Sequence, residues 1–156
     1  MKNIEFELLF NNQELIEDFT KLIYKNWSHL RPDSSYEELL LRIKKKVSSN
    51  KIPIHIIAKN NNEFIGGLII KENEMEQFPD FKYWIGSVVV EPKYQDQKIA
   101  TKLLNYSCQI AKEKKIKKLY LQTEYLNGGL YLKLGWKPVC RLKDKGDQIL
   151  VMVKEI

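Results

Sequence analysis

Residues 88–123, VVVEPKYQDQKIATKLLNYSCQIAKEKKIKKLYLQT, contain the strand, helix and strand that decide the fold. A β-rich run ends in three valines, and Pro92 stops it because proline lacks the N–H that a strand ladder needs. Apolar residues then recur at helical spacing (Ile99, Leu103, Tyr106, Ile110), which predicts a helix over Lys98–Lys114. A second β-rich run follows at Lys117–Thr123. This order predicts a crossover that joins two parallel strands.

The rest of the chain alternates between helical and strand patterns on both sides of this crossover. An S-x-x-E capping box, Ser34 to Glu37, begins the second helix. The order β-α-α-β-β-β-α-β-α-β-β places an antiparallel hairpin region before the crossover, so we predict an α/β fold with a mixed central sheet. A length of 156 residues suits one domain, 1–156. The remaining strands are predicted at Ile4–Phe10, Ile54–Lys59, Glu63–Lys71, Lys82–Val90, Val139–Leu142 and Gln148–Glu155, and the remaining helices at Gln13–Ser28, from Ser34 to about Val47, and at Leu126–Leu134.

The composition is that of a globular protein, with 44% hydrophobic and 29% charged residues. The net charge of +6 is consistent with an anionic partner such as a nucleotide cofactor, and equally with a lysine-rich solvated surface. The two cysteines, Cys108 and Cys140, form no C-x-x-C pair, so we expect no metal site. No window of 18 apolar residues predicts a membrane span, and Glu5 and Glu7 interrupt any signal-peptide core. We therefore expect a cytoplasmic protein.

The helix of the crossover begins at about Gln97, directly after a strand and a short loop. The first turn of a helix has free backbone N–H groups and the positive end of the helix dipole, and it binds phosphate without a special side chain. The pattern therefore predicts a phosphate site here, although every strand–helix–strand unit has such a terminus.

Three sequence segments sharpen this prediction. Gln95–Ala100 (QDQKIA) resembles the pyrophosphate loop of the GCN5-related N-acetyltransferases, whose pattern is Gln or Arg, two residues, Gly, one residue, then Gly or Ala. Glu91–Tyr94 (EPKY) resembles the usual lead-in to that loop, and Leu130–Trp136 (LYLKLGW) resembles the L-Y-x-K-L-G-F/W segment of the same family. The resemblance covers about residues 63–155 well, and the two N-terminal helices more loosely.

The resemblance implies an acyl-CoA N-acyltransferase fold, acetyl-CoA as cosubstrate and transfer of acetyl to a primary amine, either a small cationic amine or a protein amine. The strand would pair with the pantetheine arm through backbone groups, and the loop would hold the diphosphate. The implied cofactor-binding residues are Val88, Val89, Val90, Gln95, Asp96, Gln97, Lys98, Ile99, Ala100 and Thr101.

The loop departs from the family pattern at two positions. Lys98 stands where the family usually has glycine, and Asp96 where it often has glycine. Glycine allows positive φ and close approach of the backbone to phosphate, and Asp96 would repel a diphosphate that it faced. Lys98 adds a cation, and Gln95 can donate hydrogen bonds. The departure leaves open an alternative function, a non-catalytic acyl-CoA-binding or regulatory protein of the same fold.

By resemblance to the family, Tyr131 is the catalytic acid, which protonates the departing CoA thiolate. A phenol with a pKa of about 10 is protonated at neutral pH; the alternative is a core tyrosine of an apolar helix. The acceptor must attack as a neutral amine, and no single base stands out. The resemblance further implies that a backbone N–H near Val88, at a splay in the sheet, stabilises the tetrahedral intermediate. The possible bases are Glu74, Glu76, Asp80, Glu91 and Glu124; of the two histidines, His55 alternates within a strand as a structural residue does.

The acceptor site is predicted around Trp27, Arg31, Tyr83 and Trp84, because the first two helices and the third β-rich run border the acceptor in this family. The nearby acidic segment 72–80 would suit a cationic amine, or be a solvated connection. Lysine runs at 44–46 and 112–118 raise nucleic-acid binding as a rival, but no recognition motif accompanies them, so we expect none. We expect a monomer or a homodimer, with no membrane partner.

Overall fold

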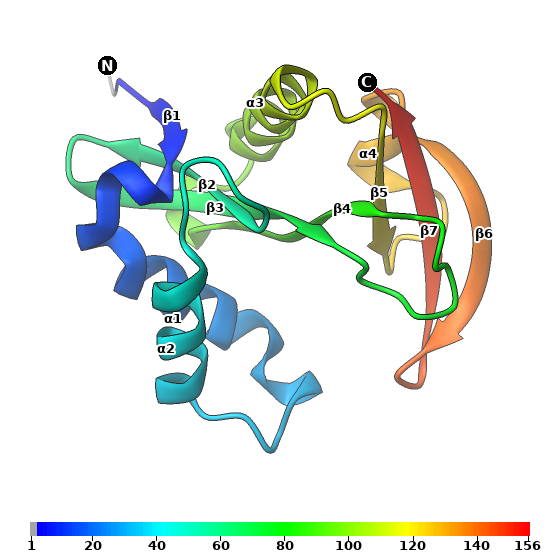
Figure 1. Cartoon of the computed structure of the whole chain (residues 1–156), viewed down its shortest axis with the longest axis horizontal. Coiled ribbons are helices and arrows are strands. Elements are labelled where there is room, and N and C mark those ends of the chain that lie inside the picture. Colours follow the sequence, from blue (N-terminus) through cyan, green and yellow to red (C-terminus); the bar gives the residue numbers. More distant parts are fainter. Residues whose placement is uncertain (1–2) are drawn as a thin grey trace.

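A computed structural model describes residues 3–156 and contains a sheet with the strand order β1-β2-β3-β4-β5-β7-β6 (Figure 1). All neighbouring strands pair antiparallel except β4 and β5, which are parallel. The predicted element order and mixed sheet are confirmed. The strands are β1 (Glu5–Leu8), β2 (Ile54–Asn60), β3 (Glu63–Glu72), β4 (Tyr83–Val90), β5 (Lys118–Thr123), β6 (Lys137–Asp144) and β7 (Asp147–Glu155), and the α-helices are α1 (Ile16–Trp27), α2 (Tyr36–Lys46), α3 (Ile99–Glu113) and α4 (Gly129–Lys133).

The helices cover the two faces of the sheet, with α3 on one face and α1 and α2 on the other (Figure 1). Alternate residues of β2 show the division, because Ile54 and Ile56 pack in the core under α3 while Ile57 packs with Phe19 of α1. Gly67 of β3 leaves room for the Phe19 ring, since a Cβ there would lie 2.5 Å from Phe19 Cε2. Within residues 3–156, no helix has both the length and the hydropathy to cross a bilayer.

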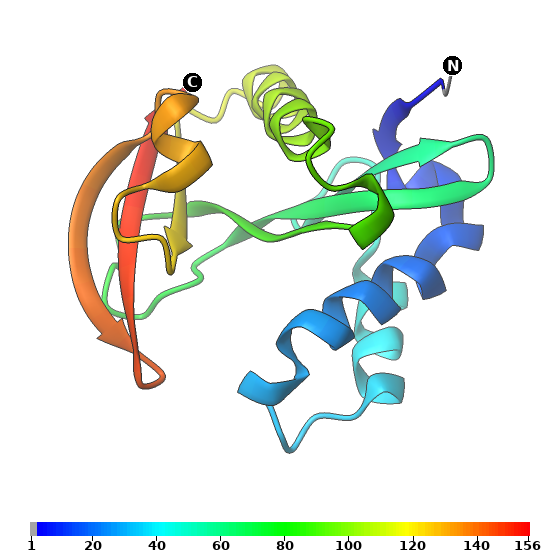
Figure 2. The same cartoon turned by 180° about the vertical axis from the view of Figure 1, so that it is seen from behind.

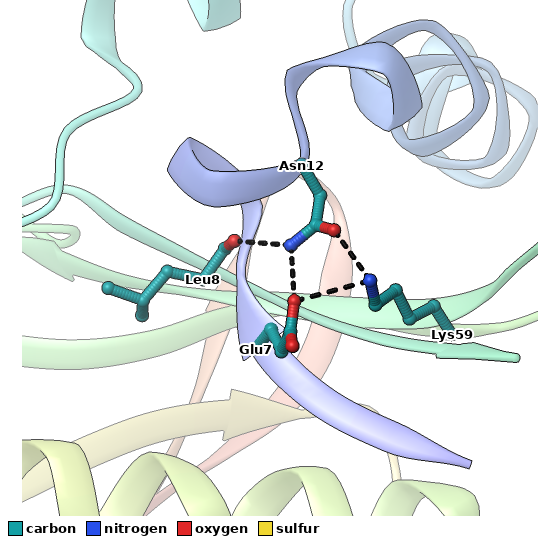
Figure 3. Close-up of polar contacts among 4 residues, drawn as sticks. All are labelled: Glu7, Leu8, Asn12 and Lys59. Carbon is teal, nitrogen blue, oxygen red and sulfur yellow. Dashed lines mark hydrogen bonds and ion pairs between the residues drawn. The ribbon is translucent and has the colours of Figure 1, made fainter. Parts of the chain in front are cut away.

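The start of α1 differs from the prediction because of a polar network around Asn12 (Figure 3). The Asn12 amide donates to Glu7 Oε2 at 2.6 Å and to the Leu8 carbonyl at 3.2 Å, and Lys59 Nζ donates to Asn12 Oδ1 at 2.7 Å. A side chain that bonds nearby backbone competes with helix formation. The strand therefore ends at Leu8, a 3₁₀ segment (η1, Leu9–Leu15) follows, and α1 begins at Ile16 instead of Gln13.

The cap of α2 lies one residue later than predicted. Ser35 is the N-cap, and its hydroxyl accepts a hydrogen bond from the Glu38 N–H at 3.1 Å. The N-cap is therefore Ser35 instead of Ser34, and it is the first residue of the second of two overlapping S-x-x-E patterns.

Strands β4 and β5 diverge shortly after they meet. Their pairing register contains one residue pair, Trp84 with Tyr120. Farther along β4, Ser87 and Val88 both lie opposite Leu68 of β3, because the register shifts by one residue, and Ser87 has a φ of 54°. Such a bulge bends a strand and increases its twist. The sheet is therefore open between the second half of β4 and β5, as Figure 2 shows from behind.

Candidate active site

A cleft of about 980 Å³ lies where the sheet opens, with the helices α1 and α2 on one side. Its other side is formed by the ends of β3 and β5, by α4 and by the turn between β6 and β7. Segments that are far apart in the sequence therefore border one space. A cleft of this volume has the size of a typical small-molecule site.

The structure brings Trp27, Arg31, Val88 and Tyr131 together as lining residues of this cleft. These are the predicted catalytic tyrosine, one strand residue of the predicted cofactor path and two of the four predicted acceptor residues. An acceptor in the cleft can therefore reach both the open edge of β4 and the Tyr131 side chain.

Tyr83 and Trp84, the other two predicted acceptor residues, do not line this cleft. Trp84 is fully buried, its Nε1 donates to the Phe81 carbonyl at 2.6 Å, and its ring packs 5.6 Å from that of Tyr120. Tyr83 is half-buried, with Lys82 Nζ 5.2 Å from its ring centre. Trp84 lies at the point where β4 and β5 still pair, so its side chain belongs to the core.

Tyr131 lies on α4, half-buried, with its ring at 73° and 6.3 Å from the buried Trp136 ring. Burial, and to a smaller degree the neighbouring Tyr125, raises the pKa of the Tyr131 phenol above its usual value. The hydroxyl is therefore protonated at neutral pH and available as a donor.

The backbone of β4 turns polar groups into the opening of the sheet. The Glu91 N–H donates to the Ile65 carbonyl at 2.8 Å in the β3–β4 register. Because paired residues alternate along an antiparallel ladder, Val89 pairs with β3 and Val90 turns its N–H and carbonyl toward the open side. Gln95 Nε2 donates to that Val90 carbonyl at 3.1 Å, so this amide closes the loop instead of pointing freely outward.

The loop before α3 has the backbone conformation of a glycine loop without glycine. Asp96 and Lys98 both have a φ of 61°, in the left-handed region, and these are the two positions at which the sequence departs from the family pattern. Lys98 is the N-cap of α3 and makes no side-chain capping bond, and the first turn contains no acidic residue. The first N–H groups of a 15-residue helix are therefore without a side-chain cap.

The ten predicted cofactor residues follow one path from the opening of the sheet to the start of α3. Val88 alone among them lines the cleft, whereas the other nine lie farther along this path. The side chains of Val89 and Ile99 are buried, so a ligand on this path would meet their backbone instead.

An ion pair that the sequence did not indicate lies at the end of β3, beside β4, and lines the cleft. Lys71 Nζ is 2.5 Å from Glu74 Oε1, and both residues line the cleft together with Gly86. A Cβ on Gly86 would overlap Lys71 Cε, so glycine leaves the space that the lysine occupies. The other carboxylate oxygen of Glu74 is buried and has no hydrogen-bond partner among residues 3–156. Glu74 was one of five possible bases in the sequence; nothing in the sequence pointed to Lys71 or Gly86.

His55 is a further residue whose place in the cleft the sequence did not reveal. It is 3% exposed, lines the cleft, and its ring packs edge-on to Phe19 at 5.7 Å. Burial and the charge of Lys46 lower its pKa to about 4, so the imidazole is neutral at pH 7. Its Nδ1 has no hydrogen-bond partner within the described residues.

Comparison with known proteins adds three findings. The model of the acetyltransferase (GNAT) family matches residues 13–136. N-alpha-acetyltransferase 30 of Schizosaccharomyces pombe is 25% identical over 134 residues, which cover 84% of this chain and 73% of that protein. An aminoglycoside 6'-acetyltransferase type Ii (TM-score 0.73, 23% identity, 97% of this chain and 96% of that one) and an aminoglycoside 6'-N-acetyltransferase complexed with coenzyme A (TM-score 0.74, 19% identity, 98% and 96%) share the fold.

Proposed function

We propose, because the chain belongs to the acetyltransferase (GNAT) family, that residues 1–156 form a single domain that moves acetyl from acetyl-CoA to a primary amine. One observation carries the proposal: the opening between β4 and β5 connects the uncapped start of α3 with a cleft that contains Tyr131. A ligand with a phosphate end and a reactive end fits this path.

Acetyl-CoA supplies the activated thioester. We assign its diphosphate to the start of α3, where backbone N–H groups and the helix dipole favour anions. The left-handed conformations of Asp96 and Lys98 support this assignment, because the loop has the shape that glycines normally provide. The Val88–Val90 backbone would guide the pantetheine arm toward the cleft, through polar groups such as those that Val90 turns to the open side.

Starting from the ammonium, the nitrogen loses two protons and the sulfur gains one: the first proton leaves to Glu74 before the attack, and the second leaves after it and restores the proton that Tyr131 gives to sulfur. The amine nitrogen forms a bond to the acetyl carbon, the carbon–sulfur bond breaks, and the electron pair goes to sulfur. Glu74 accepts the proton of the ammonium, supported by its unpartnered carboxylate oxygen inside the cleft. The protonated Tyr131 donates to the thiolate. No covalent enzyme intermediate is required.

Two measurements test the proposal. Acetyl-CoA at hundreds of micromolar should raise the melting temperature, because a ligand of the native state stabilises it. Thiol release with a panel of amines should then detect turnover, and Tyr131→Phe should reduce it about 100-fold with little change in acetyl-CoA binding. Tyr106→Phe is the matched control, since this half-buried tyrosine of α3 lies outside the cleft.

Three results would contradict parts of the proposal. Binding of acetyl-CoA without turnover of any amine would favour the non-catalytic alternative. Absence of binding would refute both functions. Unchanged turnover in Tyr131→Phe would remove this tyrosine from the mechanism while leaving acetyl transfer in place.

A further inference from the structure

The helical wall of the cleft is positively charged. Its formally charged side chains are Arg31, Arg42 and Lys46, and no carboxylate of η2 (Ser28–Leu30) or α2 lines the cleft beside them. Arg42 and Lys46 are four residues apart on α2 and therefore lie on one face of the helix. In the part of the chain that the structure describes, none of these three cations forms an ion pair with a carboxylate. Their charge is available to a ligand.

The opposite wall is mainly acidic. Figures 1 and 2 show the β6–β7 turn and the helices α1 and α2 projecting to the same side of the sheet, and residues from both line the cleft. Lys71 neutralises one of the acids, Glu74, and Lys145 is the one other cation that lines this wall within residues 3–156. Opposite charges on two walls orient a ligand that carries both signs. The carboxylates that line this side are Glu72, Glu74, Glu124, Asp144 and Asp147.

A buried polar atom of β2 that has no hydrogen-bond partner among residues 3–156 also lines the cleft. His55 Nδ1 is buried beside the cleft without a hydrogen-bond partner in the described chain, and the charge of Lys46 reaches this imidazole. Buried polar atoms of native proteins are nearly always paired, with protein, water or ligand. A cation and a hydrogen-bonding ring in one ligand cleft are the components of an anion site.

We infer that Arg42, Lys46 and His55, with Arg31 nearer the helix start, form an anion subsite, and that the acceptor is a primary amine that also carries a carboxylate or phosphate. The amine lies at Glu74 on the acidic wall, and the anionic group lies against α2. A polycationic acceptor would place a positive charge against Arg42 and Lys46, which is unfavourable. This inference rests on the proposed acetyl transfer and adds the acceptor class.

The test compares acceptors of equal size and different charge in the thiol-release assay. One series is a short peptide with aspartates, asparagines or lysines after a free N-terminus; the other is a free amino acid and its amide, so the two series separate peptide from small-molecule acceptors. We expect kcat/KM at least about tenfold higher for the anionic member than for its neutral counterpart in one series. Raising the salt concentration should reduce the ratio, because exposed charges are screened.

Charge reversal on α2 supplies the matched variants. Arg42→Glu with Lys46→Glu should lower kcat/KM for the anionic acceptor at least about tenfold and leave the KM for acetyl-CoA unchanged. Lys45→Glu is the control, since this residue is exposed on the same helix and does not line the cleft. Arg42→Gln with Lys46→Gln replaces the double reversal if that variant melts early.

The remaining outcomes distinguish failure of the anion subsite from failure of the proposed function. Turnover of lysine or asparagine acceptors at least as fast as their acidic counterparts would overturn the anion subsite and leave the proposed function intact. A changed KM for acetyl-CoA in the α2 variant, with the acceptor preference retained, would assign these cations to the cofactor and likewise overturn it. No turnover of any amine, with acetyl-CoA still bound, would overturn the proposed function and the inference with it.

Discussion

Replacing Lys98 by glycine should stabilise the protein, because this residue holds a left-handed backbone. Its φ is 61° and its ψ is 22° at the N-cap of α3. A residue with a Cβ in this region loses about 1–2 kcal/mol, whereas glycine enters it freely but loses about 0.5–1 kcal/mol more backbone entropy on folding. The difference predicts a gain of about 0.5–1 kcal/mol in the free energy of unfolding, or roughly 1–4 °C in melting temperature for a chain of this length.

Urea denaturation followed by tryptophan fluorescence measures this difference, with Lys98→Ala as the matched control. Alanine removes the charge and the long side chain but keeps the Cβ, so its midpoint should remain near that of the wild type. A midpoint of Lys98→Gly at or below the wild type would refute the reasoning. An equal gain in both variants would attribute the effect to the lysine charge instead of to the backbone.

Three further predictions test separate parts of the molecule. Gly67→Ala should destabilise the protein by about 1–3 kcal/mol in urea denaturation, because the new Cβ would lie 2.5 Å from the buried Phe19 ring; a cost below about 0.5 kcal/mol would contradict this packing. Gly86→Ala should change stability by less than about 1 kcal/mol, since the end of Lys71 can move, yet it should lower kcat/KM for the amine; equal kcat/KM would show that this lysine position is irrelevant to turnover. The pKa of Glu7 is lowered from 4.5 by its hydrogen bond and its lysine neighbour, so its contribution to stability is present above pH 4.5 and is lost as the pH falls through the lowered pKa; Glu7→Gln should remove that part of an acid titration of stability, and an identical titration would refute it.

The order of strands and helices was predictable because periodicity and turn residues act over a few neighbouring positions. The ends of helices and strands were less predictable where a residue distant in the sequence contributes to them. The start of α1 depends on a hydrogen bond from Lys59 to Asn12, which lies 47 residues away in the sequence. The α2 cap had two equivalent serines, and only the folded geometry distinguishes Ser35 from Ser34.

Trp84 shows why alternation along a strand does not identify a site. A period of two tells which residues share a face, but it does not tell where along the strand that face is covered. Trp84 lies opposite Tyr120 on β5, where the two strands still pair, and is therefore enclosed. Two residues farther on, Gly86 lines the cleft. The divergence of two strands separates core from site. The family resemblance implied a splay near Val88, but strand periodicity alone gave no sign of the bulge at Ser87.

The distribution of charge in the cleft could not be predicted from the sequence for a related reason. The net charge of +6 is consistent with an anionic partner, and the acidic segment 72–80 would suit a cationic one. The sequence did not decide between these two kinds of partner. Both signs occur in one cleft because α2 and the β6–β7 turn, about 100 residues apart in the chain, border the same space. Charges act over a Debye length of about 8 Å at physiological salt. A ligand in the cleft therefore responds to the charges of the cleft walls and little to the net charge of the chain. Reversing charges on α2 that line the cleft should therefore alter acceptor choice, whereas Lys45→Glu, which changes the total as well, should not.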